Sequence, residues 1–119
     1  MDNIQTRVTL DDSLNALTDD LVRLSSKIDT AIEQSVQAYS NCDIELAQQI
    51  ISEDTIINEK RFEIEERCLQ IMVTQQPVAG DMRMIVTGMN IVTELERMGD
   101  HAAGIARLAV RVEEVPKRD

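Results

Sequence analysis

Aliphatic residues at steps of three and four positions constrain the fold of this chain most. The first such series consists of Leu10, Leu14, Leu17, Leu21, Leu24, Ile28 and Ile32. Polar residues fill the positions between them, which is the pattern of an amphipathic helix with one apolar face. The spacing predicts a long helix over about residues 10–40.

The same spacing resumes after a short break. Asn41, Cys42 and Asp43 supply the break, and aspartate is a residue type that caps helix N-termini. The next apolar positions are Ile44, Leu46, Ala47, Ile50, Ile51, Ile57, Ile64, Cys68, Leu69 and Ile71. A second helix is therefore predicted over about residues 43–74.

A proline and a glycine mark the second break. Pro77 and Gly80 stand close together, and Asp81 lies where a carboxylate favours a helix N-terminus. The third predicted helix covers about residues 78–112. Three long helices with short connections predict an all-α fold, an antiparallel three-helix bundle.

Composition agrees with one helical domain and limits its partners. The only aromatic residues are Tyr39 and Phe62, too few for a typical β-sandwich or barrel. A chain of 119 residues is long enough for one core, so residues 1–119 are expected to form a single domain. The formal charge of −10 repels nucleic acids and anionic membranes. Cations or a basic protein surface are better electrostatic partners.

The sequence contains no segment typical of secretion or membrane insertion. Its N-terminus has neither a basic start nor an apolar run, and no later stretch lacks charges for long enough to span a bilayer. We expect a cytoplasmic protein. In that compartment Cys42 and Cys68, which have no CxxC spacing, are expected to be ordinary buried or half-buried thiols.

A narrow polar stripe follows the third predicted helix. Interrupted by Gly104 and Leu108, it consists of Arg83, Thr87, Asn90, Glu94, Arg97, His101 and Arg111. Nearly all other positions of this helix are apolar or small, so the helix should pack on more than one side. A lone bundle would leave a flat apolar surface in water. We therefore predict self-association, as a homodimer or a higher oligomer.

Four polar residues interrupt lines that otherwise read as core. Glu96 points away from the polar stripe and Asp100 follows one turn later, while Asp54 and Asn58 form a similar pair on the second helix. Neighbouring carboxylates on an apolar face are costly to desolvate unless a cation faces them. These residues are therefore candidate metal ligands. Their oxygen atoms suit magnesium, calcium, manganese or ferric iron more than zinc or copper.

Ion pairing is the alternative interpretation of these residues. Glu96 and Asp100 could face a neighbouring helix and pair with an arginine such as Arg61. Asp54 and Asn58 could make a polar contact between helices. Spacing alone leaves both interpretations open.

The remaining reactive side chains favour structural roles. Helical spacing predicts core positions for Met72, Met82, Met84, Met89 and Met98. His101 lies on the polar stripe and is expected in solvent. The chain has no Gly-rich phosphate loop, no nucleophile with a histidine-based partner set, and Met98 where a di-iron bundle would have the glutamate of Glu-x-x-His. We predict a protein that is not an enzyme.

Two segments have a distinctive order of residues. They are Gln75-Gln76-Pro77-Val78-Ala79-Gly80-Asp81-Met82-Arg83 and Glu94-Leu95-Glu96-Arg97-Met98-Gly99-Asp100. On these, and on the segments 7–17, 43–47, 54–58 and 63–69, the sequence resembles the PhoU family, the regulatory proteins of the phosphate-specific transport system.

The resemblance implies a PhoU-like, spectrin-repeat-like bundle, of which family members usually have two in tandem and this chain has one. It also implies a regulator of phosphate uptake and the phosphate-starvation response. Such an adaptor contacts the transporter ATPase, the sensor histidine kinase, or both. Metal clusters of some members map to Glu96 with Asp100 and to Asp54 with Asn58, where asparagine departs from the family's carboxylate. Iron, manganese, magnesium and zinc are the ions to test. The alternatives are an iron-storage bundle and a generic dimerisation module.

Overall fold

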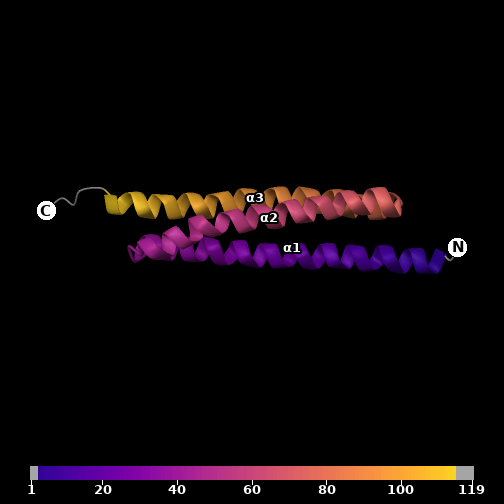
Figure 1. The fold of residues 1–119 in the computed structure, drawn as a ribbon, viewed down its shortest axis with the longest axis horizontal. Helices are drawn as coiled ribbons and strands as arrows, with labels where there is room; N and C mark the ends of the chain where they lie inside the picture. Colours follow the sequence, from indigo (N-terminus) through magenta and orange to yellow (C-terminus); the bar gives the residue numbers. More distant parts are fainter. Residues whose placement is uncertain (1–2, 115–119) are drawn as a thin grey trace.

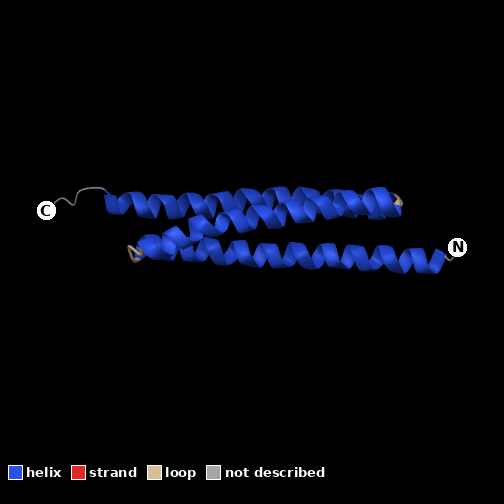
Figure 2. Cartoon of the chain, viewed as in Figure 1, coloured by secondary structure: helices blue, strands red, loops and turns tan. Residues whose placement is uncertain are grey.

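Three long helices make up the described part of the chain (Figures 1 and 2). The computed structural model describes the backbone of residues 3–114 and the side chains of residues 7–112. Helix α1 spans Asn3–Ser40, α2 spans Ile44–Gln75 and α3 spans Ala79–Glu114. Helices α1 and α3 run in the same direction, α2 runs opposite to both, and each helix contacts the other two (Figure 1). The predicted all-α three-helix bundle is confirmed.

Helix α1 begins earlier than its apolar periodicity indicated, at Asn3 rather than near Leu10. Arg7 lies in this additional part of the helix. Its guanidinium is 3.0 Å from a carboxylate oxygen of Asp11 and 2.6 Å from one of Asp81, in the first turn of α3. An ion pair between two helices, which apolar spacing cannot reveal, thus connects the start of α1 to the start of α3.

The connections use left-handed backbone at two residues that are not glycine. Cys42 has φ 54° and Gln76 has φ 43°, whereas Gly80 lies inside α3 with an ordinary φ. The Asp43 side chain accepts a hydrogen bond of 3.0 Å from the backbone N–H of Leu46, as expected for a helix cap. Because Cys42 lies in this turn, its side chain is exposed, and the prediction of a buried or half-buried thiol is wrong for it.

The core changes character along the bundle. One part is built mainly from leucine, isoleucine and valine, and it consists of Leu10, Leu14, Leu17, Leu24, Ile28, Ile57, Ile64, Cys68, Ile71, Ile85, Val92 and Leu95. The other part, near the connection between α1 and α2, consists mainly of alanine: Ala31, Ala38, Ala47, Ile50, Ala102, Ala106 and Ala109. Small side chains permit close approach of helices there. Among the described residues, no helix is long and apolar enough to cross a membrane.

Candidate functional site

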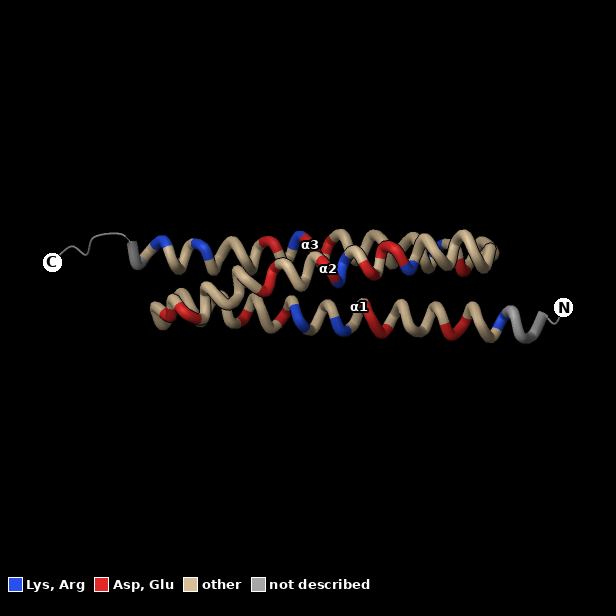
Figure 3. The backbone as a smooth tube through the Cα atoms, viewed as in Figure 1, with Lys and Arg blue, Asp and Glu red and all other residues tan. Residues whose placement is uncertain are grey.

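Polar side chains line the contact between α2 and α3 in the middle of the bundle, where both helices have charged positions (Figure 3). We call this region the α2–α3 polar seam. It comprises Asp54, Asn58, Arg61 and Glu65 of α2 with Glu96, Asp100 and Arg107 of α3. The two helices are antiparallel, so Arg61 lies opposite Glu96 and the earlier residue Asp54 lies near the later residue Asp100.

Arg61 of α2 lies between two carboxylates, one on its own helix and one on α3. Its Nη1 donates to Oε1 of Glu65 over 3.2 Å, and its Nε lies 3.4 Å from Oε2 of Glu96 without forming a hydrogen bond. The guanidinium also stacks over the Phe62 ring, 4.1 Å from its centroid. The Arg61 side chain is only 17% exposed, so water screens these contacts less than at the open surface. The ion pair with Arg61 that spacing left open is present for Glu96.

Asp54 occupies a more costly position in the same seam. Its Oδ1 atom is buried and has no hydrogen-bond partner among the described residues. Burial raises the pKa of the Asp54 carboxyl, and the nearby charge of Asp100 raises it further, while Arg107 lowers it. A buried carboxylate oxygen without a donor is unfavourable in its charged form.

Gly99 brings α3 close to Asp54. A Cβ atom at this position would lie 3.2 Å from Cγ2 of Ile57 and 4.0 Å from Oδ1 of Asp54. The absence of a side chain therefore permits the close contact of the two helices at this point. Asn58 lies one turn along α2 from Asp54 and is half-buried.

The four candidate metal ligands thus all lie along one seam, but in different environments. Asp54 and Asp100 interact with each other, Asn58 is near Asp54 on α2, and Glu96 is engaged by Arg61. Within the described residues, no three His, Cys, Asp or Glu side chains are grouped so that they could hold a metal ion. One copy of the described chain therefore offers two neighbouring carboxylates and an amide. Metal binding stays a prediction.

The predicted polar stripe of α3 faces solvent. Arg83, Arg97 and His101 are all exposed, and Arg97 pairs with Glu94 at 3.0 Å on the same helix. Arg83 donates a hydrogen bond to the backbone carbonyl of Ala79 within α3, and it also lines the space between α3 and α1.

Two of the methionines lie outside the core. Met72 and Met89 pack against it as predicted, but Met84 and Met98 are 46% and 47% exposed, so their prediction as core residues is wrong. Leu69, an apolar position of the second helix, is also 53% exposed. Apolar residues cover more of these helices than two neighbouring helices can bury.

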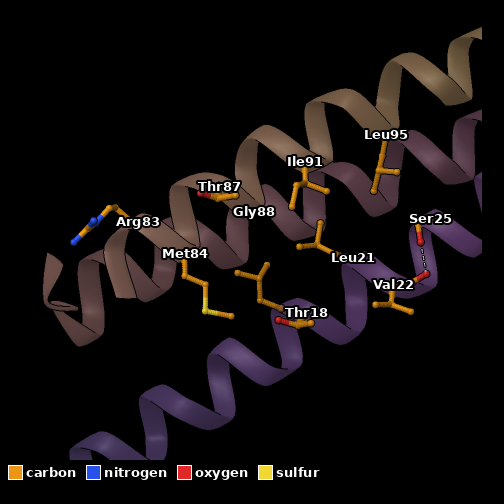
Figure 4. A pocket seen from close by; sticks show the side chains of 11 residues that line it. Thr18, Leu21, Val22, Ser25, Arg83, Met84, Thr87, Gly88, Ile91 and Leu95 are labelled. Carbon is orange, nitrogen blue, oxygen red and sulfur yellow. Dashed lines mark hydrogen bonds between the residues drawn. The ribbon is translucent and has the colours of Figure 1, made fainter. Parts of the chain in front are cut away.

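An apolar groove between α1 and α3 was not predicted from the sequence. The α1–α3 groove has a volume of about 490 Å³ and is lined by Leu17, Thr18, Leu21, Val22, Ser25, Arg83, Met84, Thr87, Gly88, Ile91 and Leu95 (Figure 4). A signal was present in the sequence, because Met84, Ile91 and Met98 recur at steps of seven. This spacing is typical of a seam between packed helices.

Known proteins give an independent view of the whole chain. Residues 21–109 match the PhoU domain. The chain is 36% identical over 96 residues to the "Phosphate-specific transport system accessory protein PhoU homolog" of Aquifex aeolicus, covering 81% of this chain and 43% of that protein. It is 38% identical over 108 residues to the homologue of the same name from Clostridium acetobutylicum, covering 90% and 49%. The homologue from Streptococcus pneumoniae is 32% identical over 108 residues, covering 91% and 50%.

The chain spans about half the length of these curated relatives. The match itself covers most of the chain, including all of α2, most of α3 and about half of α1. The motifs noted in the sequence lie on the connection between α2 and α3 and on α3 beside the polar seam. The chain therefore belongs to the PhoU family.

Proposed function

We propose that this chain is a cytoplasmic accessory regulator of phosphate-specific transport. It restrains phosphate uptake and the phosphate-starvation response by contact with the transporter ATPase, the sensor histidine kinase, or both. It has no substrate of its own. The observation behind the proposal is family membership, because the relatives are named as accessory proteins of this transport system.

The solvent-facing stripe of α3 is the partner surface in this proposal. It places Arg83 and Arg97 on an exposed helix face within a chain of net charge −10. A partner with a basic surface is attracted by the overall charge, while carboxylates of that partner could pair with these arginines. Charge complementarity of this kind affects association rate and partner choice more than total affinity.

Co-purification tests the adaptor role. The full chain is mixed with the purified ATPase subunit of a phosphate transporter, or with the cytoplasmic part of the sensor kinase. We expect binding to at least one of them, and weaker binding of an Arg83→Glu, Arg97→Glu double variant. Arg23→Glu is the matched control, because Arg23 is 79% exposed but lies on α1, outside the stripe. A chain that binds neither protein would contradict the adaptor proposal.

A metal ion in the polar seam would tune this contact. Asp54, Asn58 and Asp100 would supply oxygen atoms, and Glu96 would join them after leaving Arg61. The buried, unpaired Oδ1 of Asp54 supports this part of the proposal, since a cation would satisfy it. Hard cations such as ferric iron, manganese or magnesium suit such a donor set better than zinc.

Elemental mass spectrometry tests metal binding directly. The wild type and a Glu96→Ala, Asp100→Ala variant are incubated with ferric iron, manganese, magnesium or zinc and then desalted. Stoichiometric metal in the wild type and in the control variant, but not in the Glu96→Ala, Asp100→Ala variant, would support the site. The control is Glu94→Ala, which removes an exposed carboxylate paired only with Arg97. Equal metal content in all three proteins would contradict a site in the seam.

A further inference from the structure

Basic side chains gather between α1 and α2 near the middle of the bundle, where both helices have Lys or Arg positions (Figure 3). They border a pocket of about 140 Å³, which we call the α1–α2 basic pocket. Its lining consists of Asp20, Arg23, Leu24, Lys27, Lys60, Glu63 and Ile64. Leu24 and Ile64 are each 3% exposed, so they form an apolar floor beneath the charged side chains.

The register of the two helices places two lysines opposite each other. Nη1 of Arg67 in α2 donates a hydrogen bond to Oδ2 of Asp20 in α1, which fixes the pairing of these antiparallel helices. Lys27 follows Asp20 by seven residues, and Lys60 precedes Arg67 by seven residues, so both lie about two turns from that pair. Both line the pocket. Like charges at facing positions repel each other, which is unfavourable unless an anion lies between them.

The two carboxylates of the lining are already paired. Asp20 accepts the hydrogen bond from Arg67 and lies 3.7 Å from Nη1 of Arg23 on its own helix. Glu63 lies 3.5 Å from Nζ of Lys60, one turn away on α2. Each carboxylate therefore has at least one cation of its own.

Lys27 is the cation that remains. It forms no ion pair with any residue that the structure describes, and its side chain is exposed. Around the pocket there are four cations, Arg23, Lys27, Lys60 and Arg67, but only two carboxylates, Asp20 and Glu63. A local excess of two positive charges thus occurs within a chain whose net charge is −10.

Charge and size favour a phosphate group as the ligand. A phosphate group carries about two negative charges at neutral pH, which matches this excess, whereas a carboxylate or chloride carries one. The pocket volume of about 140 Å³ equals that of roughly four or five water molecules, enough for a phosphorus atom and its four oxygens. Lysine binds phosphate as a point charge, and arginine binds it through its planar guanidinium.

We propose that the α1–α2 basic pocket binds one phosphate group, held between Lys27 and Lys60 with Arg23 at its edge. The group belongs to a free phosphate ion or to a small phosphorylated molecule. This site lies on a different helix contact from the α2–α3 polar seam and uses none of its residues. Binding at this pocket does not depend on the accessory role proposed above.

NMR titration of the full chain with sodium phosphate, at constant ionic strength, tests the site. Backbone amide signals of residues near Lys27 and Lys60 should shift and saturate at millimolar phosphate. A Lys27→Gln, Lys60→Gln variant should bind at least about tenfold more weakly, because it loses two charge-assisted hydrogen bonds. The matched control is Arg83→Gln, Arg97→Gln, which removes the same charge from exposed positions of α3. Circular dichroism melts show that each variant is folded.

Parallel titrations identify the source of the phosphate group. Sodium sulfate, which has the same shape and charge, should compete with phosphate, whereas sodium chloride at equal ionic strength should not. Tighter binding of glycerol 3-phosphate than of inorganic phosphate would support a small phosphorylated molecule as the ligand, and the reverse order would support the free ion. The proposal would be overturned if phosphate caused no saturable shifts, or if the lysine and arginine double variants weakened binding equally.

Discussion

The two sides of α3 differ in the side chains that they place against the neighbouring helix. Toward α2, in the polar seam, Glu96 and Asp54 are half-buried charged groups, and Arg61 neutralises one of them within the same chain. Toward α1, at the groove, apolar residues are left in water. The seam therefore contains charges that are partly neutralised within the chain, and the groove contains apolar surface that the described helices leave exposed. A single helix thus contributes to a polar contact inside the bundle and to an open apolar surface.

The largest expected effect is the loss of stability when a buried side chain is truncated, and it should be smaller at the open groove than in the closed core. Ile64 is 3% exposed, so Ile64→Ala should lower the free energy of unfolding by about 2–5 kcal/mol. Leu21 borders the open groove and is only partly buried, so Leu21→Ala should cost less, about 1–2 kcal/mol. Urea denaturation monitored by circular dichroism measures both. Equal costs would mean that Leu21 is as enclosed as Ile64.

The ion pairs of the seam should contribute next. Arg61→Ala leaves Glu65 and Glu96 without their cation in a region that solvent screens incompletely. The expected loss is about 1–3 kcal/mol in the free energy of unfolding. Arg97→Ala, which removes an exposed pair with Glu94, should change stability by less than about 0.5 kcal/mol. Similar small losses for the two variants would show that the seam is as well solvated as the surface.

Two glycines offer a matched comparison of the two sides. At Gly99, a new methyl group would lie 3.2 Å from Ile57, which is 4% exposed and has little room to move. At Gly88, it would make ordinary contacts of 3.6 Å with leucine side chains at the groove. Alanine favours the helix at both sites, but overpacking opposes it at Gly99. The free energy of unfolding of Gly88→Ala should exceed that of Gly99→Ala by about 1–2 kcal/mol. Thermal melts should show the same order, with Gly88→Ala melting at the higher temperature.

The smallest effect concerns the charge of Asp54. Its pKa is raised in the folded state, so the charged carboxylate destabilises the fold. This penalty is complete above the folded pKa and disappears as the pH falls through the folded pKa to the unfolded one. Asp54→Asn should stabilise the domain at pH 7 by about 0.5 kcal/mol, because solvent screens a half-buried group.

Denaturation of the Asp54→Asn variant and the wild type over a pH series measures this effect. The difference in stability between them should shrink as the pH is lowered, since the wild type loses its penalty on protonation. A difference that grows in acid would mean that the Asp54 carboxylate is stabilised in the folded state, and that a donor or cation faces it.

The sequence by itself determined the elements that depend on local pattern. Steps of three and four predicted the three helices, Asp43 predicted a cap that the structure contains, and the polar stripe containing Arg97 was expected in solvent and is found there. These features follow from residues within a few turns of one another. Family membership likewise follows from linear motifs.

Tertiary structure decided which apolar or charged side of each helix meets another helix. Spacing placed Glu96 away from the polar stripe, but its partner Arg61 lies on another helix. Periodicity grouped Met84 with Met89, although Met84 is exposed at the groove and Met89 packs against the core. The physical reason is that a helix with a wide apolar arc has several rotations that bury similar area. Only packing against both neighbours selects one, and that choice left the α1–α3 groove open and buried one carboxylate oxygen of Asp54.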